Sequence, residues 1–96
     1  MKIWLDDERF CPDGFVWIKS ATSCIEELKN NFVDEISLDH DLGLPDETGY
    51  DVLLWIYEQV VTNGYRPPHV HIHTANPVAR KQMVDLLNRI LERMPS

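Results

Sequence analysis

Three short polar segments of this 96-residue chain carry residues that could do chemistry together. They are residues 6–9 (DDER), 39–41 (DHD) and 73–76 (HTAN), and each directly follows a short apolar run. Clustered carboxylates repel one another, and a hard divalent cation with oxygen ligands relieves that repulsion. The sequence therefore predicts a Mg²⁺ or Mn²⁺ site. Its candidate ligands are Asp6, Asp7, Asp39 and Asp41.

Basic and titratable side chains beside these acids suggest phosphoryl chemistry. A bound cation together with Arg9 would attract a phosphoryl group and stabilise charge on its oxygens. His73 is the better candidate for proton transfer because it ends its apolar run at the acidic segments. His40 lies between two acids and could act as an acid or base, or equally be a structural histidine. Asp46 and Asp51 are interpreted as loop and helix-end residues instead.

Histidines 69, 71 and 73 alternate along one strand and so share a face. This spacing could suggest zinc, but a structural zinc site needs four ligands, and no soft ligands stand nearby in the sequence. We therefore expect His69 and His71 to be surface or interface residues.

Four strands and three helices must position these segments. The predicted strands are residues 2–5, 15–19, 35–38 and 69–73, and the predicted helices begin near Ser20, Thr48 and Pro77. Asn76 before Pro77 is a favourable helix start, and Gly64 is placed to end the second helix. The first helix can return the chain across the sheet only if the first two strands are parallel, which places the polar segments at one edge.

Alternation within the strands separates two faces of the predicted sheet. One face is aliphatic and forms the core, whereas no helix is expected to cover the other, here called the open face. We expect the open face to be a contact surface, in a homodimer formed through Trp4, Phe15 and Trp17. The open face consists of Lys2, Trp4, Phe15, Trp17, Lys19, Glu35, Ser37, His69 and His71.

Composition and charge exclude several classes of protein. A length of 96 residues predicts a single α/β domain over residues 1–96, and no apolar run is long enough to span a membrane. No signal-peptide pattern follows Met1, so a cytoplasmic location is expected. A net charge of −7 argues against a broad nucleic-acid surface. Cys11 and Cys24 lack metal or redox spacing and are expected to be free thiols.

The motifs LDDER, SLDHDLG, TGYD and HTANP together resemble the cyclic-phosphate processing receiver domain family, a divergent and shortened relative of response-regulator receivers. The resemblance implies a flavodoxin-like parallel sheet in the order 2-1-3-4 with three helices mainly on one face. Asp39 and Asp41 both remain candidates for the receiver's acceptor position, because each satisfies one of its two spacings. The receiver's fifth strand and its lysine have no counterpart in the sequence.

The resemblance also implies a bacterial or phage protein that acts on a cyclic phosphate, in a phosphate-containing small molecule or at an RNA end. In such a phosphoesterase, Thr74 and Asn76 would help Arg9 to orient the phosphate, and His73 or His40 would transfer a proton. The alternative is a non-enzymatic receiver-like module that accepts a phosphoryl group or binds a partner. The missing fifth strand and the additional histidines favour the enzyme.

Overall fold

The computed structural model describes residues 1–8, 10–43 and 46–94. It contains the seven predicted elements in the predicted order. These are β1 (Lys2–Leu5), β2 (Val16–Ile18), α1 (Ala21–Asn30), β3 (Glu35–Leu38), α2 (Gly49–Asn63), β4 (His69–Ile72) and α3 (Pro77–Arg93). β2 and β4 are shorter than predicted, but the backbone of His73 still donates to Leu38 O (2.9 Å), so the β3–β4 pairing reaches the site.

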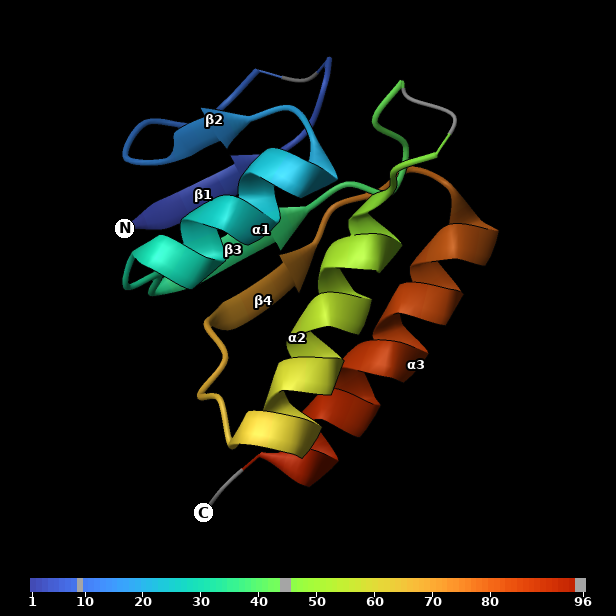
Figure 1. Ribbon diagram of the computed structural model, residues 1–96. Helices are drawn as coiled ribbons and strands as arrows, with labels where there is room; N and C mark the ends of the chain where they lie inside the picture. The colour runs from blue at the N-terminus through green and yellow to red at the C-terminus, as the bar shows by residue number, and fades with distance from the viewer. Residues whose placement is uncertain (9, 44–45, 95–96) are drawn as a thin grey trace.

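The four strands form one parallel sheet in the order β2-β1-β3-β4, which confirms the expected topology. In Figure 1 the four arrowheads point toward the same edge of the sheet. The loops that leave β1 and β3 and the turn into α3 lie at that edge, where parallel α/β sheets bind their ligands. The order of the strands thus brings together the three polar segments, which are distant in sequence.

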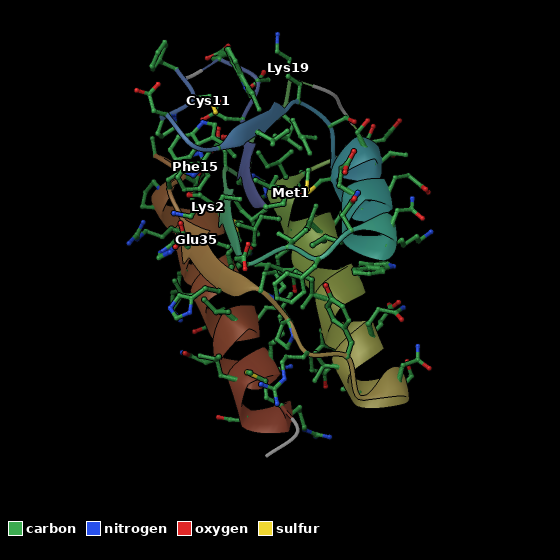
Figure 2. All side chains as sticks on the ribbon, turned by 90° about the vertical axis from the view of Figure 1, so that its left-hand side faces the viewer. Met1, Lys2, Cys11, Phe15, Lys19 and Glu35 are labelled. Atoms are coloured by element: carbon green, nitrogen blue, oxygen red, sulfur yellow. The ribbon has the colours of Figure 1, made fainter. Side chains whose placement is uncertain are left out.

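The core lies between the sheet and its three helices. Ile3, Leu5, Ile36 and Leu38 have no exposed surface and pack in one cluster with residues of α1, α2 and α3. The open face carries no described helix, and the side chain of Trp17 is 42% exposed there. Figure 2 shows Lys2, Phe15 and Glu35 together on the side of the strands away from α1. The prediction of a one-sided sheet is therefore correct.

Side chains and a glycine fix the ends of the helices. Ser20 Oγ accepts from Ser23 N at the start of α1, and Thr48 and Asp51 form a capping box at the start of α2. Gly64 ends α2 with φ 65°, and Asn76 caps α3 as predicted. Among the described residues, no helix has the length and apolar character needed to cross a membrane.

Candidate active site

A cavity of about 310 Å³ opens at the edge of the sheet where the strands end. Its lining is dominated by carboxylates and is contributed by the loops after β1 and β3 and by the turn before α3. The lining residues are Asp6, Asp7, Glu8, Asp39, Asp41, Gly43 and Ala75. All four acids that the sequence proposed as metal ligands therefore face one cavity.

Asp6 is the most buried acid of this cavity, with no exposed surface. It directly follows β1, and its backbone N–H donates to Ile18 O (3.1 Å). Its backbone carbonyl accepts from the indole Nε1 of Trp17 (2.7 Å), and its Oδ1 accepts from Glu8 N (2.9 Å). These contacts hold the carboxylate at a fixed position in the cavity lining and leave Oδ2 directed toward His73.

Asp39 lies beside Asp6 because β1 and β3 are neighbours. Its N–H donates to Leu5 O (2.9 Å), its Oδ1 accepts from His40 N (2.8 Å), and the residue is 8% exposed. Gly49, the first residue of α2, packs against its main chain: a Cβ there would lie 1.9 Å from Asp39 O. A side chain at position 49 would therefore displace this acid.

His73 directly follows β4 and lies beside Asp6, although it does not itself line the cavity. Its Nε2 lies 3.0 Å from Asp6 Oδ2, and its Nδ1 lies 2.7 Å from Ser37 Oγ. The indole of Trp4 stacks on the imidazole, with ring centroids 3.9 Å apart and planes within 6°. The ring is thus held at both nitrogens and on one face, and its side chain is 15% exposed.

Asp6, Asp39 and His73 form the one group of metal-ligating side chains found among the described residues, with donor atoms within 4.8 Å of one another. Two ionised carboxylates held this close together repel each other. A divalent cation offsets this repulsion. Two buried carboxylates beside a solvent-connected cavity therefore fit a hard cation that keeps some of its waters.

Asp7 and Asp41 line the cavity but lie outside this three-residue group. Asp7 Oδ2 lies 2.6 Å from where a Cβ of Gly43 would be, so the glycine leaves room for that acid. Asp41 is exposed, and its Oδ1 lies 2.8 Å from Nδ1 of His40. Of the two candidates for the receiver's acceptor position, Asp39 is the one grouped with Asp6.

Thr74 and Asn76 make local contacts that organise the start of α3. Thr74 Oγ1 accepts from Asn76 N (3.2 Å) and is 6% exposed, while Asn76 Oδ1 accepts from Val78 N and Ala79 N (both 3.1 Å). Neither residue lines the cavity. Their expected role in holding a phosphate stays a prediction. Arg9 lies outside the described residues.

The remaining histidines of β4 lie away from the cavity on the open face. His69 and His71 are exposed, and Nε2 of His71 is 3.4 Å from a carboxylate oxygen of Glu35. Neither belongs to the group of metal-ligating side chains among the described residues. This placement agrees with the expectation that they are surface residues.

The sequence did not single out Ser37 and Trp4 as partners of His73. Their only signal was a serine between two aliphatic residues, Ile36 and Leu38, and a tryptophan on the same predicted face. Strand register explains the omission: Trp4 and Ser37 are neighbours across β1 and β3, whereas the imidazole reaches them from β4.

Comparison with known proteins agrees with this geometry. The family model described as "Cyclic-phosphate processing Receiver domain" matches residues 1–89. No curated protein and no solved structure gives a significant match. The matched range includes β1 to β4 and every residue of the cavity lining.

Proposed function

Because the chain belongs to the cyclic-phosphate processing receiver domain family, we propose that it hydrolyses a cyclic phosphate in a metal-dependent reaction at Asp6, Asp39 and His73. Membership links the chain to cyclic-phosphate processing. The observation that carries the finer proposal is the pair of buried carboxylates with His73 within 4.8 Å at the cavity. The expected substrate is a phosphate-containing small molecule, such as a cyclic nucleotide, or an RNA end.

The proposed reaction opens the ring by hydrolysis. Water forms a bond to phosphorus, one ring P–O ester bond breaks, and the product is a phosphate monoester with a free hydroxyl. The attacking water gives up one proton to a base at the site or to solvent, and His73 or His40 delivers one to the departing oxygen, so that one water is consumed overall. Mg²⁺ or Mn²⁺, when bound, would supply positive charge near the phosphoryl oxygens and lower the pKa of water.

The position of each residue suggests its role in metal binding, proton transfer or phosphate orientation. Asp6 and Asp39 would hold the cation, with Asp7 and Asp41 at the cavity wall as further or water-mediated ligands. Protonated His73 would transfer to the departing oxygen the Nε2 proton that otherwise bonds to Asp6 Oδ2, while its Nδ1–H donates a hydrogen bond to Ser37 Oγ. His40 is an alternative acid or base: its Nδ1 lies 2.8 Å from Oδ1 of Asp41, which lines the cavity, although His40 itself does not. Arg9, Thr74 and Asn76 would orient the phosphate.

The test combines calorimetry with Mg²⁺ or Mn²⁺ and phosphorus NMR of a 2′,3′-cyclic nucleotide. We expect Asp39→Asn to lose divalent binding and turnover together, while metal-free thermal stability holds or rises because repulsion is relieved. His73→Ala should bind metal normally and turn over roughly a hundredfold more slowly. Asp13→Asn, which removes an exposed acid away from the cavity, is the matched control for charge.

Two results would contradict this proposal. If Asp39→Asn binds the metal as tightly as the wild type does, the acidic side chains are not the metal site. If His73→Ala loses metal binding, His73 is a metal ligand rather than a proton donor. Acetyl phosphate tests the alternative function: a stable aspartyl phosphate without turnover of the cyclic nucleotide would indicate a phosphoryl-accepting signalling module.

We also propose that the open face contacts a second copy of the chain. Trp17 is 42% exposed and Phe15 is half-buried, and a covered aromatic side chain removes on the order of 150 to 250 Å² from water. Sedimentation of the wild type over a range of concentrations tests this, with Trp17→Glu as the disrupting variant. A wild type that stays monomeric at high concentration excludes the homodimer.

A further inference from the structure

We infer that the open face of the sheet positions His73 and Asp6, with Ser37 and Trp4 holding the imidazole and Trp17 holding the acid. The three residues lie on β3, β1 and β2. Each reaches the site by a different interaction: a hydrogen bond to the imidazole, a stacked ring, and a hydrogen bond to the main chain. The claim that these three residues affect turnover rests on the proposed function. The claim that Ser37 and Trp4 hold the ring of His73 does not.

Ser37 forms a hydrogen bond with Nδ1 of the His73 imidazole. Its hydroxyl lies 2.7 Å from Nδ1 and is 4% exposed, so water cannot readily take its place. A carboxylate only accepts, so Nε2 of His73 donates to Asp6. A serine hydroxyl can donate to or accept from Nδ1, and it therefore keeps Nε2 directed at Asp6 Oδ2 whether the imidazole is neutral or protonated.

Trp4 fixes the plane of the ring. Its indole is parallel to the imidazole within 6°, and Phe15 packs against the indole edge-on at 5.9 Å between centroids. Its Nε1 is buried and has no hydrogen-bond partner among the described residues. Trp4 therefore acts through its ring face, and an aromatic replacement without the N–H should preserve this action.

Trp17 acts on the acid. Its Nε1 donates to the backbone carbonyl of Asp6 at 2.7 Å, directly after β1 ends, and Lys19 Nζ lies 4.8 Å from the centroid of the same indole. The hydrogen bond links the edge strand β2 to the residue that faces both Asp39 and His73. The aromatic residues of the open face thus have partners within the chain as well as surface available for a second copy.

The first test reads the His73 ring directly by NMR of metal-free protein, without reference to activity. In the wild type, the stacked indole should shift the ring protons of His73 upfield. Trp4→Leu should remove this shift, Trp4→Phe should keep most of it, and Ser37→Ala should change the nitrogen signals of the ring. Trp55→Leu removes an indole from α2 on the other side of the sheet and should leave the His73 signals unchanged.

The second test separates positioning from metal binding. Ser37→Ala and Trp4→Leu should lower kcat on a 2′,3′-cyclic nucleotide by on the order of tenfold or more, with the Kd for Mn²⁺ unchanged, and Trp4→Phe should restore kcat. Unchanged His73 signals in both Ser37→Ala and Trp4→Leu would overturn the inference. If the wild type fails to hydrolyse any cyclic phosphate, the proposed function fails, while the NMR result still decides the inference.

Discussion

Two cavities of similar volume lie at opposite ends of the sheet and differ in lining. The cavity at the carboxyl edge measures about 310 Å³ and contains five acids, whereas the other measures about 290 Å³ and lies between the start of β4 and the end of α3. The second is lined by Pro67, Pro68, His69, Val70, Leu87, Ile90, Leu91 and Met94. Volume alone does not distinguish the two.

Buried charge does distinguish them. Asp6 and Asp39 are removed from water in the acidic cavity, which a protein sustains only when hydrogen bonds or an ion compensate. Glu8 N and His40 N supply part of this compensation. The apolar cavity needs no compensation, because its lining extends the hydrophobic core to the surface. Function is therefore expected at the acidic cavity and stability at the apolar one.

The largest effect is expected from Gly49→Ala, which would break the acidic cavity. The new Cβ would lie 1.9 Å from Asp39 O and 2.9 Å from Asp39 C, both main-chain atoms that cannot move without moving β3. We expect a loss of more than about 4 kcal/mol in the free energy of unfolding, measured by urea denaturation. Gly14→Ala is the control, since nothing lies within 4 Å of its new Cβ, although its φ of +87° adds some strain. Equal losses in both variants would contradict the packing argument.

A smaller effect, confined to stability, is expected at the apolar cavity from Ile90→Ala. Ile90 is fully buried and belongs to the core, so its truncation should cost about 3 kcal/mol. Divalent binding should not change when it is measured at a temperature where the variant is folded. A Kd for Mn²⁺ that weakens more than twofold would mean that the two ends of the sheet are coupled.

Asn76→Ala tests whether Asn76 only caps α3 or also contributes to the acidic site. Loss of the cap of α3 should cost about 1 kcal/mol, read as a lower Tm. Turnover of a cyclic nucleotide decides whether the side chain has a second role. Full turnover at a temperature well below Tm would remove Asn76 from the substrate-binding residues.

The smallest effect is expected at Glu47, in the loop that also carries Asp39 and Asp41. Hydrogen bonds from Thr22 N and Oγ1 (2.8 and 2.9 Å) lower the pKa of this carboxyl. A lowered pKa stabilises the fold above the ordinary glutamate pKa of about 4.3, and this contribution disappears as pH falls through the folded-state pKa. Glu47→Gln should therefore lower Tm slightly at neutral pH, and the difference should vanish in acid. If the variant still has the lower Tm at low pH, the loss of stability comes from the glutamine side chain and not from the charge of Glu47.

Most of the fold could be predicted because its signals are local. Apolar alternation predicted the exact first and last residues of β1 and β3. Gly64 correctly marked the end of α2, and Asn76 correctly marked the start of α3. The short edge strand β2 was predicted too long, since its neighbours on one side are solvent and the pattern there carries less information. The sheet order came from the resemblance, and the structure confirms it.

The sequence by itself determined which acids could share a site, because Asp6 and Asp39 directly follow parallel strands and such strand ends meet at one edge. Only the tertiary structure decided which of the polar residues meet. Strand register places Ser37 and Trp4 against His73, and the packing buries Asp6 and Asp39 while Asp41, in the same cavity, stays exposed. The physical reason is that contact between strands depends on register and side-chain direction across the sheet, which spacing along one strand does not specify.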